Sequence, residues 1–286
     1  MKKTIGLVTL AALAVLLGLA AGCPKGGRND TPARPDFAKV RNAYKGIAAR
    51  PDAAETRFAV FGDIKDGPEI MEKIVQAVEK DGKYDFLMCV GDMVSGATDE
   101  RYTAFCRALL RNVRETPFIF VPGNHDESED STESNPAQLY EKYLGDTRYS
   151  FSVGKTLFVC LDNASGHLPG QFPWLEKLLK DKRDKYDALI VFMHMPPVDT
   201  TMKYSGYSMS QTNSEHLMRI LKEYRATQVF CGHIHTRFEF NWQGVPIYIT
   251  GGGGAGLSGG HHPQFHYLEV AVRGEKIQVA VHPVEP

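Results

Sequence analysis

Short apolar runs that each end at a polar residue recur along the chain, and this repetition constrains the fold more than any other feature of the sequence. Three such runs occupy residues 56–61, 86–90 and 118–121, and the first two are followed by helix candidates at 68–80 and 98–113. An alternation of strand, polar tip and helix is typical of parallel βαβ units. The sequence therefore predicts an α/β fold in which polar residues gather at the carboxyl ends of the strands.

The second half of the chain continues the pattern with two buried runs that deliver histidines. Residues 188–193 end at His194, and residues 228–231 lead into His233 and, two residues on, His235. In an extended segment alternate residues share a face, so we expect His233 and His235 to project to the same side. Other segments predict helices at 137–144, 171–179 and 214–224, and hairpins that pair 149–153 with 157–161, 237–242 with 245–250, and 265–272 with 276–282.

The first 22 residues have the pattern of a secretory signal. Two lysines precede an apolar stretch, 4–21, and small residues then lead to Cys23. This ending resembles a bacterial lipoprotein signal, which implies cleavage before Cys23 and lipidation of its sulfur, although Ala20 stands where that signal usually has leucine. We expect residues 1–22 to be a lipoprotein signal peptide and the protein to be extracytoplasmic, anchored to a bacterial membrane. The alternatives are secretion with a free Cys23 and an uncleaved anchor.

Composition after this signal is that of one globular domain. Residues 23–55 mix Gly, Pro and charges with few large apolar residues, so we expect a tether, with a short helix around 37–48, before a domain at 56–286. Without Lys2 and Lys3 the 33 basic residues become 31 against 34 acidic ones, a formal charge of −3 that argues against nucleic-acid binding. We expect a monomer whose four other cysteines are free buried thiols, because no close-spaced pair suggests a disulfide.

Side chains of metal-ligand type stand at five strand ends, which is the strongest functional signal in the chain. They are Asp63, Asp92, Asn124 with His125, His194, and His233 with His235. A single histidine after a strand is usually structural, but polar groups at the ends of several buried strands lose hydration unless something satisfies them. A divalent cation would satisfy all of them. Mixed oxygen and imidazole ligands suit Mn, Fe or Zn better than Ca or Mg, and the absence of thiolates argues against a structural zinc site.

These motifs, in this order, resemble the calcineurin-like metallophosphoesterase superfamily. The matching blocks are Gly62-Asp63, Gly91-Asp92, Gly123-Asn124-His125-Asp126, His194 with Pro196-Pro197, and Gly232-His233-Ile234-His235. The resemblance covers about residues 56 to 282. It implies a four-layer α/β/β/α sandwich with two mixed sheets, and a site holding one or two divalent metal ions that hydrolyses phosphate esters.

The resemblance also implies a role for each matching residue. Asp92 would bridge two metals, one also held by Asp63 and His235 and the other by Asn124, His194 and His233. A metal-bound hydroxide would attack phosphorus in line while the cations neutralise the charge on the phosphoryl oxygens. His125 would contact the phosphate and protonate the leaving oxygen, and Asp126 would orient the imidazole of His125.

Lys65 departs from the family pattern, which has a ligating histidine at that place. An ammonium group has no lone pair for a metal, and its charge repels a cation. Lys65 could turn away from the site, it could replace part of the charge of the first metal and hold the substrate phosphate, or the first site could be weak and the protein mononuclear. We hypothesise the second arrangement, in which Lys65 is a catalytic residue.

Two functions remain open from the sequence. The first is a phosphomonoesterase or phosphodiesterase, and the second is a non-catalytic phosphate- or metal-binding lipoprotein whose site Lys65 has disabled. His125 and Asp126 favour the enzyme, because a simple binder would not need them. The substrate depends on loops such as 127–135 and 198–212, and the glycine-rich segment 251–256 could contact phosphate or simply turn the chain.

Overall fold

A computed structural model describes residues 37–65, 67–128, 135–164, 168–198, 207–258 and 262–286 of the chain. These residues all fall within one compact unit, Pro35–Pro286. The expected signal peptide, Cys23, the first part of the expected tether, and most of the loops around 130 and 203 lie outside the described residues. Within the described ranges, every helix is too short or too polar to cross a membrane.

The first sheet places three polar strand ends at one edge. Its strands are β1 (Thr56–Phe61), β2 (Phe86–Cys89), β3 (Phe118–Phe120), β10 (His266–Arg273) and β11 (Lys276–Pro283). They lie in the order β11-β10-β1-β2-β3. Strands β1, β2 and β3 run parallel, while β10 pairs antiparallel with β1 and with β11. The carboxyl ends of the parallel strands therefore meet at the same edge.

The second sheet repeats this arrangement with the histidine-bearing strands. Its strands are β4 (Tyr149–Val153), β5 (Thr156–Cys160), β6 (Ala188–Phe192), β7 (Gln228–Cys231), β8 (Arg237–Trp242) and β9 (Val245–Thr250). They lie in the order β4-β5-β6-β7-β9-β8. Strands β5, β6, β7 and β9 are parallel, and the hairpins β4–β5 and β8–β9 supply the antiparallel edges. The hairpins expected from the sequence are confirmed.

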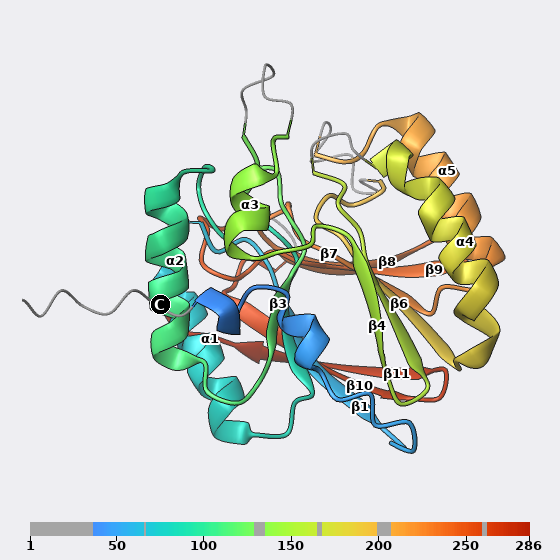
Figure 1. Ribbon diagram of the computed structural model, residues 1–286, viewed down its shortest axis with the longest axis horizontal. Coiled ribbons are helices and arrows are strands. Elements are labelled where there is room, and N and C mark those ends of the chain that lie inside the picture. Colours follow the sequence, from blue (N-terminus) through green and yellow to red (C-terminus); the bar gives the residue numbers. More distant parts are fainter. Residues whose placement is uncertain (1–36, 66, 129–134, 165–167, 199–206, 259–261) are drawn as a thin grey trace, which may run out of the picture. The chain divides into compact units, whose positions relative to one another are not determined.

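Helices cover the outer face of each sheet (Figure 1). They are α1 (Pro68–Asp81), α2 (Asp99–Asn112), α3 (Gln138–Tyr143), α4 (Phe172–Lys182) and α5 (Gln211–Glu223), with short 3-10 turns η1 (Phe37–Lys39), η2 (Ala43–Gly46), η3 (Leu168–Gln171) and η4 (Arg183–Lys185). Local chemistry sets the helix ends. Pro68 opens α1 and Gly82, with φ 65°, ends it, while the hydroxyl of Thr98 accepts the backbone N–H of Arg101 at the start of α2.

Three buried clusters correspond to the three interfaces of a four-layer α/β/β/α sandwich. One lies between the first sheet and helices α1 to α3, one between the second sheet and helices α4 and α5, and one between the two sheets. Along β1, Ala59 and Phe61 face the helices whereas Phe58 and Val60 face the other sheet, as the period of a strand requires. The predicted fold class is thus confirmed.

Residues 37–55, expected to be a tether, pack against the domain instead. Val40 is 1% exposed and belongs to the core beneath α1 to α3. The ring of Tyr44 stacks on Tyr149 with centroids 4.0 Å apart, and Oδ1 of Asn42 accepts the backbone N–H of Asp146 at 2.7 Å. These three residues therefore contact the domain whose start was expected at residue 56. Isolated apolar residues among polar ones carry no periodic signal, so the sequence could not reveal this packing.

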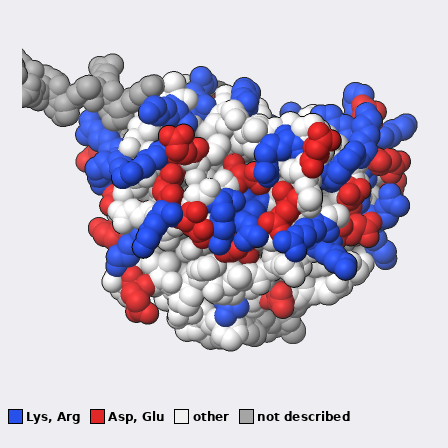
Figure 2. Space-filling model, turned by 90° about the horizontal axis from the view of Figure 1, so that it is seen from below, with Lys and Arg blue, Asp and Glu red and all other residues white. Residues whose placement is uncertain are grey.

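Charged side chains of both signs are interspersed on the face shown in Figure 2. This pattern agrees with the near balance of acidic and basic residues in the sequence. The four cysteines in the described part of the chain are free and buried, as expected.

Candidate metal centre

All nine residues expected at the site follow strands of the two sheets. Asp63 and Lys65 come after β1, Asp92 after β2, and Asn124, His125 and Asp126 after β3, while His194 follows β6 and His233 and His235 follow β7. Hydrogen bonds join the two sheets here. The carboxylate of Asp63 accepts the backbone N–H of His233 at 3.0 and 3.1 Å, and Nδ1 of His194 lies 2.8 Å from the carbonyl oxygen of Val90.

One ligand cluster surrounds the Nε2 atom of His194. This nitrogen lies 3.1 Å from Oδ1 of Asn124, 3.1 Å from Nδ1 of His233 and 3.3 Å from Oδ1 of Asp92. Asp92, His194 and His233 could hold a metal ion together, with Asn124 beside them. The four side chains are the set expected from the sequence for one of the two metals.

The hydrogen bonds of His194 show that this cluster suits a cation. The carbonyl of Val90 can only accept a hydrogen bond, so Nδ1 of His194 must carry the proton that bonds to it. In the neutral imidazole the lone pair of Nε2 then faces the side-chain oxygens of Asn124 and Asp92. Three electron-rich atoms at such short range repel one another unless a proton on Nε2 or a metal ion lies among them. A divalent ion with nitrogen and oxygen ligands fits this arrangement.

A second cluster shares Asp92 with the first. It consists of Asp63, Asp92 and His235, and Nε2 of His235 lies 3.5 Å from Oδ1 of Asp63. Nδ1 of His235 lies 2.8 Å from the carbonyl oxygen of Gly256, which orients the ring and leaves Nε2 directed at the carboxylate. Asp92 thus belongs to both clusters.

Lys65 contacts the carboxylate that the two clusters share. Its Nζ lies 3.1 Å from Oδ2 of Asp92, a buried oxygen with no hydrogen-bond partner among the described residues. The side chain of Lys65 is 17% exposed and that of Asp92 is fully buried. The ammonium therefore does not turn away from the site, which excludes the first of the three arrangements considered for Lys65.

The electrostatics of the ligand set attract positive charge. Burial opposes a charge on His194, but the carboxylates of Asp92 and Asp63 outweigh it and raise the pKa of His194 to about 9. Although burial also opposes the charge of Asp92, His194 and Lys65 hold the pKa of Asp92 well below its usual range. Burial and the charge of His194 lower the pKa of His233 to about 3, and burial, followed by the charge of Asp92, raises the pKa of Asp63 to about 7.

Backbone strain is concentrated at the site. Asp63, Lys65, Asp92 and His233 have φ values of 63°, 45°, 58° and 68°, a left-handed conformation that costs a non-glycine residue about 1–2 kcal/mol. The backbone N–H of Lys65 donates to the carbonyl of Asp92 at 3.1 Å and helps to hold this conformation. Both His233 and His235 reach the site as expected, but from a bend after β7 rather than from an extended strand, so the alternation argument for them was wrong.

The carboxylate of Asp126 makes hydrogen bonds that the family resemblance did not imply. It is fully buried, and its carboxylate accepts the backbone N–H groups of Asp92 at 2.7 Å, Gly123 at 2.8 Å and Val94 at 3.1 Å. Within the described residues, these hydrogen bonds fix the loop that carries Asp92 and do not involve the imidazole of His125. Asp126 is therefore a positioning residue. His125 stands beside the site, where its backbone N–H donates to Oδ1 of Asp92 at 3.0 Å.

The glycine-rich segment 251–256 supports the first ligand loop. The backbone N–H of Gly253 donates to the carbonyl of Gly62 at 2.7 Å, and that of Ala255 donates to the carbonyl of Asp63 at 2.8 Å. A Cβ at Gly251 would lie 2.8 Å from Oδ2 of Asp63 and 2.4 Å from a backbone oxygen. Glycine is required here for close packing of the backbone against the ligand turn.

Asn163 and Tyr207 lie next to the candidate ligands, and the sequence predicted no role for either. Oδ1 of Asn163 accepts the backbone N–H groups of His194 and Met195 at 3.0 Å each, and so fixes the end of β6. The only sequence signal for Asn163 was its place in the polar pair Asp162-Asn163, which follows β5. The ring of Tyr207, which is 53% exposed, lies 5.5 Å from that of His233 between centroids. Nothing in its surrounding loop sequence pointed to this contact.

Comparison with known proteins identifies relatives along most of the domain. A family model described as calcineurin-like phosphoesterase matches residues 56–237. The chain is 26% identical over 174 residues to a probable glycerophosphodiester phosphodiesterase, GpdQ, of Arcobacter nitrofigilis, a match that covers 58% of this chain and 62% of that protein. It is 27% identical over 228 residues to the human serine/threonine-protein phosphatase CPPED1, covering 73% of this chain and 71% of that one.

Solved structures share the fold at low sequence identity. The structure described as GAP50, the anchor in the inner membrane complex of Plasmodium, superposes with a TM-score of 0.60 at 17% identity over 81% of this chain and 89% of that chain. A structure of PhoD superposes with a TM-score of 0.58 at 11% identity over 82% of this chain and 70% of that chain.

Proposed function

Because this chain belongs to the calcineurin-like phosphoesterase family, we propose that it hydrolyses phosphate esters with the help of one or two divalent cations. The observation that carries this proposal is the pair of ligand clusters that share the buried carboxylate of Asp92. Mn, Fe and Zn suit the mixture of oxygen and nitrogen ligands. A protein that only binds phosphate or metal would not need His125 beside these ligands.

The candidate residues have different roles at this site. Asp63, Asp92, Asn124, His194, His233 and His235 would hold the cations. When bound, such cations generate a nucleophile from water at neutral pH and neutralise the charge of the phosphoryl oxygens. His125, which is half-buried beside Asp92, would donate a proton to the leaving oxygen. Asp126 holds the loop of Asp92 so that the carboxylate keeps its place as the reaction proceeds.

Lys65 stands where the family pattern has a ligating histidine, so its ammonium group needs a role of its own at this site. We propose that its ammonium supplies part of the charge that the first cation would bring and holds a phosphoryl oxygen of the substrate. The ion pair with Asp92 at 3.1 Å supports this role, because it places the ammonium among the ligands. One tightly held cation, at the cluster around His194, is the expected result.

Hydrolysis of a generic aryl phosphate monoester and of a diester, with and without added Mn²⁺, tests the proposed function. We expect turnover that depends on the metal and is lost in Asp92→Ala. The relatives are named for different substrates, a glycerophosphodiester and a phosphoprotein, so both ester classes must be assayed. Absence of turnover of either ester by protein that contains metal would contradict the proposal.

The same result would favour the second candidate, a phosphate- or metal-binding lipoprotein without catalytic activity. One observation supports this alternative, namely that Lys65 lies within 3.1 Å of the carboxylate that a second cation would need. Lys65→Ala discriminates between the two. An enzyme in which Lys65 holds the phosphate loses activity while its metal content is unchanged, whereas a binder has no activity to lose.

We also propose that the protein acts as an extracytoplasmic monomer, anchored to a bacterial membrane by a lipid on Cys23. The sequence of residues 1–23 supports this location. Metabolic labelling with a radioactive fatty acid should label the wild-type protein in bacterial cells, and Cys23→Ala should abolish the label and release the protein from membranes. A Cys23→Ala protein that stays with the membrane would contradict the proposal.

A further inference from the structure

Among the residues that the structure describes, Tyr207 is the only large apolar one that is exposed, and it stands beside the candidate metal centre. It is 53% exposed, and its ring lies 5.5 Å from that of His233 between centroids, at an angle of 47°. The backbone N–H of Met209 donates to the carbonyl of Pro196 at 3.1 Å, which holds this segment against the loop that follows His194. An aromatic surface is thus open to solvent next to a candidate ligand.

The two oxygens of Asp92 separate a cationic side of the site from the side that carries Tyr207. Nζ of Lys65 lies 3.1 Å from Oδ2 of Asp92. Oδ1 lies 3.3 Å from Nε2 of His194, and this nitrogen also lies 3.1 Å from Nδ1 of His233. Because Tyr207 contacts the ring of His233, it belongs to the side of Oδ1. A phosphoryl group held by the ammonium would therefore have an aromatic ring across the site from it.

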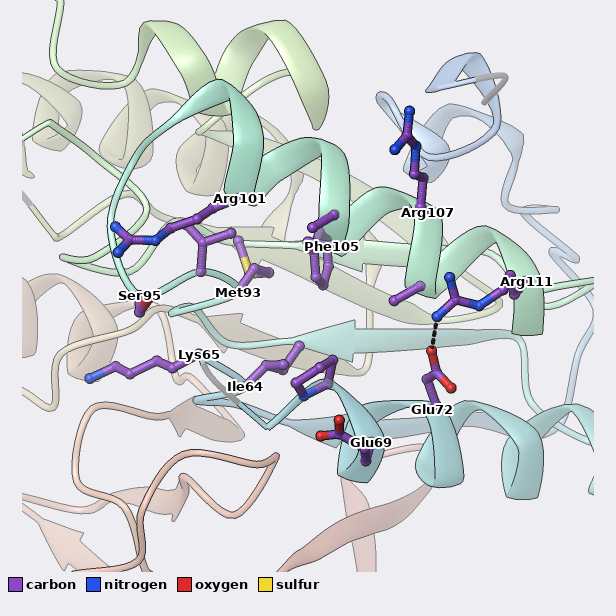
Figure 3. A pocket seen from close by; sticks show the side chains of 14 residues that line it. Ile64, Lys65, Glu69, Glu72, Met93, Ser95, Arg101, Phe105, Arg107 and Arg111 are labelled. Atoms are coloured by element: carbon purple, nitrogen blue, oxygen red, sulfur yellow. Dashed lines mark hydrogen bonds and ion pairs between the residues drawn. The ribbon is translucent and has the colours of Figure 1, made fainter. Parts of the chain in front are cut away.

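The pocket beside Lys65, between α1 and α2, offers little surface to an organic group (Figure 3). It encloses about 630 Å³, and all six candidate metal ligands lie outside its lining. Ile64, Met93 and Phe105 line it, but they are only 0%, 1% and 5% exposed. Its accessible lining is mainly charged, from Lys65, Glu69, Glu72, Arg101, Arg107 and Arg111. The aromatic surface at the site is therefore on the other side of Asp92.

His125 also lies on the side of Oδ1 of Asp92, where its backbone N–H donates to this oxygen at 3.0 Å. The proposed function assigns to His125 the proton that goes to the leaving oxygen. The leaving alcohol then points to the side of His125, which is the side on which Tyr207 stands.

We propose that Tyr207 binds the organic part of the substrate by ring stacking, and that the substrate is a phosphate ester whose alcohol carries a planar aromatic ring. This inference rests on the proposed function and deepens it by naming the substrate class. Aromatic rings attract one another in offset and edge-to-face arrangements beyond the effect of buried area. A tyrosine side chain has two rotatable bonds, so it loses little conformational freedom when a ligand packs on it.

Titration calorimetry of the metal-loaded protein with phenylphosphonate and cyclohexylphosphonate tests the inference without requiring turnover. The rings of the two ligands are similar in size, and only the first is planar. Tyr207→Leu keeps an apolar side chain without the aromatic ring, so it should lower the preference for phenylphosphonate by about fivefold. Tyr207→Phe should restore the preference, because stacking needs the ring and not the hydroxyl. The preference is compared between proteins, so a difference in acidity between the ligands cancels.

Tyr186→Leu is the matched control. Tyr186 is a partly exposed tyrosine that precedes β6, whereas His194 follows the same strand at its other end. This variant should keep the preference of the wild type. Circular dichroism and metal content, measured on each variant, show whether the fold and the ligand cluster are intact.

An adenosine phosphonate distinguishes a ring on the ester oxygen from a ring carried by a sugar. Binding that is tighter than that of phenylphosphonate and is weakened in Tyr207→Leu identifies a nucleoside as the organic part. Weaker binding than that of phenylphosphonate identifies an aryl alcohol.

A preference that Tyr207→Leu leaves unchanged would overturn the inference. So would loss of bound metal as the only effect of Tyr207→Leu, because Tyr207 would then merely support the ring of His233. If the preference depends on Tyr207 but neither aryl nor nucleoside esters are hydrolysed, the stacking role stands and the proposed function fails.

Discussion

Replacing Lys65 by histidine should create a tight metal site at the cluster of Asp63, Asp92 and His235. The ammonium lies 3.1 Å from Oδ2 of Asp92, so a dication on the same carboxylate would be about 4 Å from it. At an effective dielectric constant of about 20 the repulsion is roughly 8 kcal/mol. Because the side chain of Lys65 is 17% exposed, solvent screening reduces this repulsion to about half. The remaining repulsion corresponds to about a thousandfold weaker binding of the metal ion. Histidine also tolerates the left-handed backbone at this position, where φ is 45°.

Metal counting by plasma mass spectrometry, after loading with Mn²⁺ or Zn²⁺ and gel filtration, measures this effect. The wild type should retain one equivalent and Lys65→His two. Lys65→Met is the control, because it removes the charge without adding a ligand, and it should bind a second ion more weakly than Lys65→His. Two equivalents retained by the wild type, or one by Lys65→His, would refute the reasoning that Lys65 takes the place of a cation.

Three further changes test other parts of the structure. Asp126→Asn leaves the backbone N–H of Val94 facing an amide NH₂, so it should lower the free energy of unfolding by about 2–4 kcal/mol and weaken metal binding, measured by urea unfolding and metal titration; unchanged values would contradict a positioning role. Burial, followed by the charge of Asp162, raises the pKa of Glu127 to about 9, so the folded state retains a proton and stability falls as the pH rises from 4.5 to 9. Glu127→Gln should therefore flatten the dependence of melting temperature on pH, with a gain of up to about 3 kcal/mol at pH 7; a parallel pH profile would count against this pKa. Val40→Ala should cost about 2 kcal/mol in thermal unfolding because two buried methyl groups are lost; a change near zero would restore the tether interpretation.

The sequence was sufficient to predict the layers and the convergence of the ligands. Strand ends are easy to recognise when apolar runs stop at polar residues, and parallel strands bring those ends to one edge. Packing of the two sheets face to face then joins the two edges, so that Asn124 after β3 and His194 after β6, 70 positions apart, lie 3.1 Å from each other. The strand period of two residues and the helix period of 3.6 can be recognised in the sequence because each depends only on neighbouring residues.

The features that the sequence did not predict depend on contacts with no local pattern. The burial of Val40 and the stacking of Tyr44 require a surface formed by distant segments. The carboxylate of Asp126 turns to three backbone N–H groups rather than to the neighbouring imidazole, because buried donors need partners. The bend at His233 likewise arises from its hydrogen bond to Asp63 across the two sheets.

The six candidate metal ligands are divided by type between the two halves of the chain. Asp63, Asp92 and Asn124 supply oxygen from the first sheet, and His194, His233 and His235 supply nitrogen from the second. Neither set alone forms the cluster, so a partly folded chain would hold an ion only weakly. An ion held at this place would link the two halves of the chain, and hydrolysis would become possible only after the whole protein has folded.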